Sequence, residues 1–300
     1  MLISGAEAMK DVINTIKYKL SDPIKYRVVL DVDDVLCCRL SDLYHSKTDK
    51  AELERYFPEG IAIDWRYENI SYLHYFYPGF DKLILSILSW GWSVDFFSAG
   101  KKERNEEVIP TYLKQTFKQY SNDVDADYAT ILDSGRLRIF SYHHMTPHKS
   151  NSVGSKLTGY EKFGNCKKDL TVVSPDIDNT ILVDDDRSYV PGTQYPYIGM
   201  SYSSSQYFED SVLPEKNRPL TELDKWELKF HPNNNAAYIM GILLDCRQKL
   251  AQDQLRTLRE ALGLVLSHNG RSSMGPSDRN YSPWYLHPSY ELSEWSKGKS

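Results

Sequence analysis

Apolar positions along the chain follow two patterns, one with helical spacing and one extended. Over residues 6–20 they recur at helical spacing, and Pro23 follows this predicted helix. Residues 26–30 are short, apolar and valine-rich, which is typical of a buried strand. The same pair of patterns then repeats, because a second helix is predicted over 80–88 and a second strand over 92–97.

The alternation continues further along the chain. Another helix is expected to start near Pro110, and residues 180–183 are predicted to form a third short strand. Strands that alternate with helices are typical of a parallel sheet with helices on both faces. The expected fold class is therefore α/β, with a Rossmann-like parallel sheet. In such sheets ligands bind at the carboxyl ends of the strands.

Composition shifts divide the chain into a main domain, a linker and a C-terminal region. Residues 1–205 carry the alternating pattern, and their irregular part at about 120–165 is interpreted as an insertion. Serine and proline in residues 206–220 indicate a linker. Residues 221–300 are predicted to form a helical region with an aromatic tail, because apolar residues recur at helical spacing over 239–265.

Composition places the chain among ordinary globular proteins. Of its 300 residues 41% are hydrophobic and 26% charged, which excludes disordered and fibrous classes. The formal net charge of −5 argues against a nucleic-acid binder. We find neither a secretory signal nor an apolar run of the ~18 residues that a membrane-spanning helix needs, so a cytoplasmic location is expected. The 4 cysteines do not make a disulfide framework.

Several common catalytic signatures are missing from the sequence. It contains no Cys-x-x-Cys, His-Glu-x-x-His, Gly-x-Ser-x-Gly or Gly-x-Gly-x-x-Gly motif, and no P-loop. No cysteine is followed six positions later by the arginine that cysteine-based phosphatases need. The chemistries that depend on these motifs are therefore disfavoured.

Three of the predicted strands run directly into polar residues, namely 31–34, 98–100 and 184–186. Asp31 and Asp33 point the same way on an extended chain, and Asp184 and Asp185 would arrive on a neighbouring strand. Carboxylates so close together need a cation, and hard oxygen ligands fit Mg²⁺. A carboxylate beside Mg²⁺ can attack phosphorus, and a second carboxyl can serve as general acid and base.

Four sequence motifs resemble those of the haloacid dehalogenase (HAD) superfamily. Residues 28–35 (VVLDVDDV) resemble its Asp-x-Asp-x-(Thr/Val) motif, and Phe-Phe-Ser at 96–98 resembles its second motif. Lys-Asp-Leu at 168–170 stands 16 residues before the acidic pair at 184–185, a separation typical of the RNA polymerase C-terminal-domain phosphatase branch. The Tyr-Pro-Gly turn at 77–79 also resembles that branch. The resemblance covers about residues 24–200 and implies a HAD-like phosphatase domain.

This resemblance assigns catalytic roles to individual residues. It makes Asp31 the nucleophile and Asp33 the general acid and base. Ser98 and Ala99 would contact the phosphate, and Lys168 would anchor it. The chain departs from the family pattern at the second motif, where Phe-Phe-Ser-Ala-Gly replaces Tyr/Phe-Thr-Ala-Ser.

The resemblance also implies a Mg²⁺ cofactor. Its ligands would be Asp31, the backbone carbonyl of Asp33, and Asp185, with Asp184 in support. The fourth motif is Asp-Asp here, where relatives often have Asp-Asn.

Other residues near the motifs have competing interpretations. Lys167 is adjacent to Lys168 and is an alternative phosphate anchor. The three histidines at 143, 144 and 148 are interpreted as an exposed polar loop rather than a metal site. Cys37 and Cys38 are interpreted as packing residues.

A phosphorylated protein is the expected substrate, because the chain between Asp31 and Ser98 is too short for a large cap over the site. Aromatic residues in this stretch could stack on an aryl phosphate, which favours phosphotyrosine. They are Phe57, Trp65, Tyr67, Tyr72, Tyr75, Phe76 and Tyr77. A looser resemblance to HAD-type effector phosphatases of intracellular bacteria points the same way, and would imply delivery into a host cell.

Two alternatives remain open from the sequence. The polymerase-phosphatase branch favours phosphoserine or phosphothreonine. A second hypothesis is a weakly active HAD scaffold that binds a partner protein or a membrane surface through its C-terminal helices. The slightly basic charge of that region and its aromatic tail motivate this hypothesis.

Overall fold

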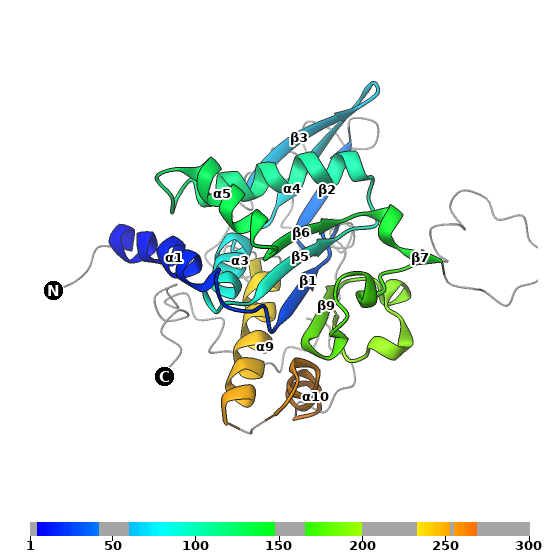
Figure 1. Ribbon diagram of the computed structural model, residues 1–300. Coiled ribbons are helices and arrows are strands. Elements are labelled where there is room, and N and C mark those ends of the chain that lie inside the picture. Colours follow the sequence, from blue (N-terminus) through cyan, green and yellow to red (C-terminus); the bar gives the residue numbers. More distant parts are fainter. Residues whose placement is uncertain (1–4, 42–59, 148–165, 200–232, 253–254, 269–300) are drawn as a thin grey trace, which may run out of the picture.

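A five-stranded parallel sheet forms the centre of the protein in this computed structural model, which describes residues 5–41, 60–147, 166–199, 233–252 and 255–268 (Figure 1). The strand order is β10-β9-β1-β5-β6. The bounds are Arg27–Leu30 (β1), Ser93–Phe97 (β5), Leu137–Phe140 (β6), Thr180–Asp184 (β9) and Ile198–Gly199 (β10). The three strands expected from the sequence are β1, β5 and β9, and they are direct neighbours with β1 in the middle.

The register of these three strands brings their carboxyl ends to one edge of the sheet. Leu30 of β1 is paired with Phe96 of β5 and with Val183 of β9. Asp31 follows at once, and its amide donates a hydrogen bond to the Val183 carbonyl at 2.9 Å. The polar strand ends that were expected to meet therefore lie side by side.

Side chains of alternate residues on the strands enter two separate apolar cores. Val28 and Leu30 are fully buried in the larger core, together with residues of all the α-helices. Val29 points to the opposite face and packs with Leu170 and Val173. Within the described residues the α-helices are α1 (Gly5–Lys19), α3 (Phe80–Ser89), α4 (Lys102–Phe117), α5 (Val124–Asp133), α9 (Asn233–Gln252) and α10 (Leu258–His268).

The opposite face of the sheet is covered by short elements. They are the 3₁₀ helices η1 (Tyr142–His144), η2 (Leu170–Val172), η3 (Ile177–Asn179), η4 (Arg187–Tyr189) and η5 (Gly192–Gln194), with the two-residue strands β7 (Thr146–Pro147) and β8 (Cys166–Lys167). The predicted α/β class, with helical elements on both faces, is thus confirmed, although one face carries 3₁₀ rather than α-helices. Within the stretch 120–165, α5 packs in the main core and β6 is an edge strand of the central sheet.

Helix α4 differs from the prediction at its start. It begins at Lys102 rather than near Pro110, which lies inside it. Proline has no amide hydrogen and is rare in helix interiors, so the sequence pattern placed the helix start at Pro110 instead. The earlier start adds two turns that carry Arg104 and Asn105, both buried.

A second, antiparallel sheet occupies much of the stretch between the first two motifs. Its strands are β2 (Cys37–Ser41), β3 (Ile61–Tyr67) and β4 (Ile70–Phe76), in the order β2-β4-β3. The sequence analysis did not predict it. It changes the interpretation of the aromatic residues that were expected to stack on an aryl phosphate. Four of them are buried in the core, namely Trp65, Tyr75, Phe76 and Tyr77, and Tyr67 and Tyr72 are half-buried. Phe57 lies outside the described residues.

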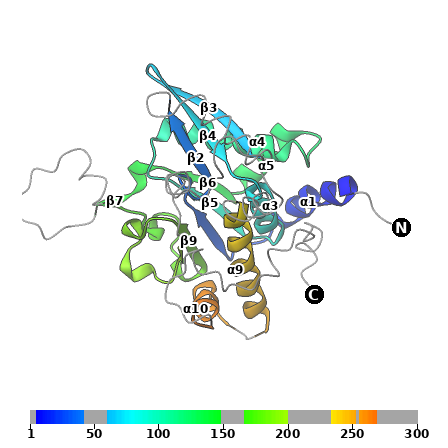
Figure 2. The same cartoon turned by 180° about the vertical axis from the view of Figure 1, so that it is seen from behind.

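The C-terminal helices pack onto helix α3 and strand β9. Figure 2 shows α9 beside α3, and α10 next to α9, where α10 also contacts β9. Ile239, Ile242, Leu243 and Cys246 are fully buried in the main core. The apolar face that motivated a partner or membrane surface is therefore covered by the protein itself. The predicted linker and aromatic tail lie outside the described residues.

Among the residues that the structure describes, no helix has the length and apolarity needed to cross a membrane.

Helix α10 offers a matched test of this packing. Leu262 is fully buried and Leu264, two residues later, is 43% exposed. We expect Leu262→Ala to lower the free energy of unfolding by about 2–5 kcal/mol, because it leaves a cavity in the main core. Leu264→Ala changes the same residue type on the same helix and should cost less than about 1 kcal/mol. Urea unfolding followed by circular dichroism measures both, and equal losses would contradict the packing of α10 described here.

Candidate active site

A buried lysine joins two of the sequence motifs. The Lys168 ammonium lies 2.7 Å from Asp31 Oδ1 and 2.7 Å from Asp184 Oδ2. None of the Lys168 side chain is exposed to solvent, and its backbone amide donates a hydrogen bond to the Tyr189 carbonyl at 2.9 Å. Lys168 therefore stands between the ends of β1 and β9 and carries the positive charge that their carboxylates require.

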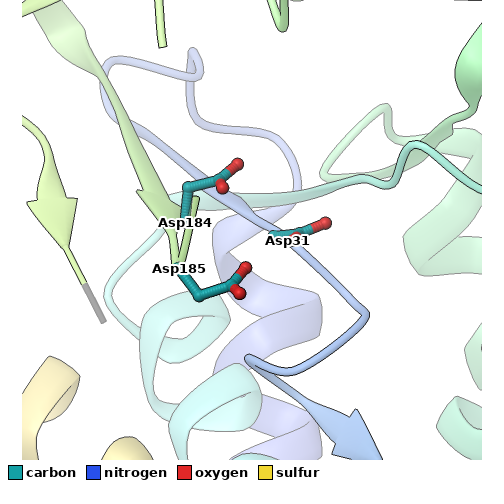
Figure 3. Close-up of side chains that lie close together, drawn as sticks. All are labelled: Asp31, Asp184 and Asp185. Atoms are coloured by element: carbon teal, nitrogen blue, oxygen red, sulfur yellow. The ribbon is translucent and has the colours of Figure 1, made fainter. Parts of the chain in front are cut away.

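Three carboxylates converge beside this lysine. The oxygens of Asp31, Asp184 and Asp185 lie within 4.8 Å of one another, and Figure 3 shows the three side chains extending to the same side of the strand ends. Asp31 and Asp184 are buried, whereas Asp185 is partly exposed. Asp184 also accepts a hydrogen bond from the Asp186 amide at 2.9 Å, which fixes its second oxygen.

Burial and mutual repulsion disfavour the charged forms of these carboxyls. Desolvation raises the pKa of Asp31 well above its usual range, against the attraction of Lys168. Desolvation likewise raises the pKa of Asp184 despite its contact with Lys168. For Asp185, burial and the neighbouring Asp184 raise the pKa to about 7. One lysine therefore does not balance three carboxylates.

The donor set fits a magnesium ion. All three converging groups are carboxylates, the hard oxygen ligands that Mg²⁺ prefers, and when ionised their three negative charges exceed the one positive charge of Lys168, an excess that a divalent cation would relieve. The Asp33 carboxylate is not part of this cluster, because it contacts Ser98 and Arg104 instead.

The second half of the site surrounds Asp33 and Ser98. The Ser98 hydroxyl donates a hydrogen bond to Asp33 Oδ2 at 3.0 Å and accepts one from the Gly100 amide at 2.9 Å. Arg104 donates two hydrogen bonds to the Asp33 carboxylate, from Nη1 to Oδ1 at 2.5 Å and from Nη2 to Oδ2 at 2.8 Å. Asp33 and Ser98, predicted from separate motifs, are thus joined by an arginine.

The environment of Asp33 is opposite to that of Asp31. Desolvation opposes the charge on Asp33, but the Arg104 guanidinium outweighs it and holds the pKa of Asp33 well below its usual range. His74 of β4 is fully buried close by, and neither ring nitrogen has a hydrogen-bond partner among the described residues. Burial and the nearby Arg104 lower the pKa of His74 to about 4, so its imidazole is neutral.

Arg104 and its neighbour Asn105 were missed from the sequence. Helical spacing could have indicated that Arg104 is buried, because it lies on the same face of α4 as the buried Val108 and Tyr112. A charged residue on an apolar helix face needs a partner, which here is Asp33.

The structure places the other sequence candidates outside the carboxylate cluster. Lys167 donates a hydrogen bond to the Ser188 carbonyl, so its ammonium is engaged outside the carboxylate cluster. His144 accepts a hydrogen bond through Nδ1 from the Ser141 amide, while His148 lies outside the described residues. Cys37 and Cys38 are buried, as expected for packing residues. Ala99 follows Ser98 in the loop after β5 and is partly buried.

Comparison with known proteins gives a likeness of fold. No family model matches the chain, and no curated protein matches it in sequence. The structure of the fission yeast RNA polymerase II CTD phosphatase Fcp1 bound to beryllium fluoride is 13% identical, with a TM-score of 0.39 over 88% of this chain and 66% of that chain. This chain therefore spans just under two thirds of that protein's length.

A second structure, of Fcp1 described as an essential RNA polymerase II CTD phosphatase, is 12% identical with a TM-score of 0.36, over 86% of this chain and 73% of that chain. Both neighbours are of the phosphatase branch that the four sequence motifs resemble.

The raised pKa of Asp185 predicts a pH-dependent affinity for Mg²⁺. A carboxyl must lose its proton to bind the metal, so protons compete with Mg²⁺ below the pKa of about 7. We expect the affinity to fall by up to about tenfold for each pH unit below this value, and to level off above it. Calorimetric titration with Mg²⁺ between pH 5.5 and 8.5 measures this.

The adjacent exposed carboxylate supplies the control. Asp185→Asn should weaken Mg²⁺ binding and flatten its pH dependence, whereas Asp186→Asn should leave both nearly unchanged. A pH-independent affinity in the unmodified protein would count against Asp185 as a ligand.

Proposed function

We propose that this chain is a Mg²⁺-dependent phosphatase that acts through an aspartyl-phosphate intermediate on phosphorylated protein, with phosphotyrosine as the favoured substrate. The observation that carries the proposal is the meeting of four motifs at one sheet edge. The buried Lys168 contacts Asp31 and Asp184, and Asp185 converges with these two carboxylates. Ser98 stands beside Asp33 at the end of the next strand. HAD-type phosphoryl transfer requires this combination of groups.

In the first step, an oxygen of Asp31 would attack phosphorus, and the bond to the leaving oxygen would break. Lys168 keeps its charge, because Asp184 and Asp31 raise its pKa against the effect of burial, and it can neutralise charge on the transferring group. Mg²⁺ held by Asp31, the Asp33 carbonyl, Asp184 and Asp185 would supply further charge neutralisation.

In the second step, Asp33 would take a proton from the water that attacks the aspartyl-phosphate. This releases phosphate and restores the Asp31 carboxylate. The ion pair with Arg104 favours the charged form of Asp33, which is the form that accepts a proton. In the first step, the protonated form of Asp33, which the ion pair makes a minor form, would deliver its proton to the leaving oxygen, and the proton taken from water in the second step restores it.

Phosphotyrosine is favoured by the same ion pair. A phenol of pKa ~10 needs less help from an acid to leave than the alcohols of serine and threonine, which are much weaker acids. An acid group that Arg104 holds as a carboxylate suits the phenol better. The half-buried Tyr67, with Lys101 stacked on its ring at 3.4 Å, lies near the Ser98 loop and could contact an aryl group.

The alternatives are separated by one set of substrates. Three peptides of one sequence, bearing phosphotyrosine, phosphoserine or phosphothreonine, are compared by phosphate release with Mg²⁺ and with EDTA. The proposal expects the highest kcat/KM on phosphotyrosine. Higher values on phosphoserine would favour the second candidate, a phosphoserine/threonine phosphatase, and no release from any peptide or from p-nitrophenyl phosphate would favour the scaffold hypothesis.

The nucleophile is tested by Asp31→Asn. An amide neither attacks phosphorus nor binds Mg²⁺ well, so we expect turnover of p-nitrophenyl phosphate to fall at least about 10³-fold. Beryllium fluoride, which mimics a phosphoryl group on aspartate, should inhibit the unmodified protein and not bind the variant. Asp186→Asn is the matched control with full activity. Retention of more than a few per cent of turnover in Asp31→Asn would contradict the proposed mechanism.

The general acid is tested by Asp33→Asn with two leaving groups. Phenyl phosphate needs protonation of its leaving oxygen more than p-nitrophenyl phosphate does. We therefore expect kcat/KM to fall about 10²–10⁴-fold on phenyl phosphate and much less on p-nitrophenyl phosphate. Equal losses on both substrates would assign Asp33 a structural role instead.

A further inference from the structure

Arg104 is buried and almost fully engaged. Its side chain is 3% exposed, compared with 32% for Asp33. Besides its two bonds to Asp33, it donates from Nη2 to Ser98 Oγ at 2.5 Å and from Nε to Asn105 Oδ1 at 2.8 Å. A guanidinium has five N–H donors. Four of them are thus directed at three side chains of the site and its supporting helix.

Neighbouring groups fix the guanidinium from both sides. Asn105 donates to Ser141 Oγ at 2.9 Å, which ties the residue that holds Arg104 Nε to the segment after β6. Gly100 lies directly against the guanidinium, because a Cβ at this position would overlap Arg104 Nη2 and Cζ. The arginine therefore has one available position, set by the loop after β5 and the first turn of α4.

This arrangement orients Asp33 rather than presenting a charge to solvent. The planar fork of arginine binds both carboxylate oxygens and fixes the plane of the carboxylate. The Ser98 hydroxyl contacts the same Asp33 oxygen, so its direction is set as well. With four donors engaged within the protein, few remain for a substrate phosphate.

We propose that Arg104 is a positioning residue, which holds the Asp33 carboxylate and the Ser98 hydroxyl in the alignment required for proton transfer. This inference rests on the proposed phosphatase function. Arg104 acts through Asp33, so its loss should mainly lower kcat, whereas loss of a direct phosphate contact would mainly raise KM.

The test is a double-mutant cycle on p-nitrophenyl phosphate and phenyl phosphate. We expect Arg104→Ala to lower kcat on phenyl phosphate by about 10²-fold, with KM changed by less than about threefold. In the Asp33→Asn background the same substitution should cause little further loss, because the residue that Arg104 orients no longer transfers protons. Arg104→Lys should restore only part of the activity, since one ammonium cannot replace the fork.

A second variant covers the case in which Arg104→Ala does not fold. Gly100→Ala keeps the arginine but displaces its guanidinium, and should lower kcat in the same direction. Arg138 supplies the matched control, because it makes a two-pronged bond to the buried Asp95, at 2.7 and 2.8 Å, on the opposite face of the sheet. Arg138→Ala should reduce stability and leave the kinetics unchanged.

The outcomes separate this inference from the proposed function. If the unmodified protein is active and depends on Asp31, but Arg104→Ala has the kinetics of Arg138→Ala, only the role of Arg104 is overturned. The inference would also be overturned if Arg104→Ala mainly raised KM and did so by the same factor in the Asp33→Asn background. Arg104 would then be a phosphate-binding residue. An unmodified protein without Asp31-dependent hydrolysis would overturn the proposed function and, with it, this inference.

Discussion

The contact of the Lys168 ammonium with Asp31 and Asp184 is the interaction on which the arrangement of the site depends. All three side chains are buried, and the lysine is the group that joins the end of β1 to the end of β9. Breaking a buried ion pair by removing one partner typically costs about 3–5 kcal/mol, because the remaining charge stays desolvated. Without Lys168 the two buried carboxyls would therefore take up protons, and the packing of the strand ends would weaken.

The pKa values of two carboxyls in a single motif, two residues apart, are shifted in opposite directions. Burial among acidic neighbours raises the pKa of Asp31, whereas the paired Arg104 holds the pKa of Asp33 low. The backbone places the two residues differently. The Asp31 amide is still hydrogen-bonded to the Val183 carbonyl of β9, whereas Asp33 lies beyond β1, directly before Asp34 with its positive φ of 64°. Environments that separate two titratable groups in this way are typical of acid–base pairs with different roles.

The strands that carry the first, second and fourth motifs could be predicted from the sequence because each is a short apolar run that ends in a polar residue. Leu30, Phe97 and Val183 all precede such residues, and parallel strands align their carboxyl ends. The partner of Asp33 could not be predicted in the same way. Arg104 approaches Asp33 only because α4 begins at Lys102, and the proline at 110 obscured that start. The antiparallel sheet was also not predicted, because its aromatic residues could be interpreted equally well as exposed substrate contacts or as core residues.

Charge balance explains why the site divides into two clusters. Asp33 and Arg104 form a neutral pair, and Arg104 is too fully engaged there to serve the other carboxylates. Asp31, Asp184 and Asp185 together carry three negative charges when ionised, and Lys168 supplies one positive charge. A single divalent cation would complete the neutralisation of these charges. The charge excess that a metal would balance therefore arises at the cluster of Asp31, Asp184 and Asp185, whereas the charge of Asp33 is balanced by Arg104 alone.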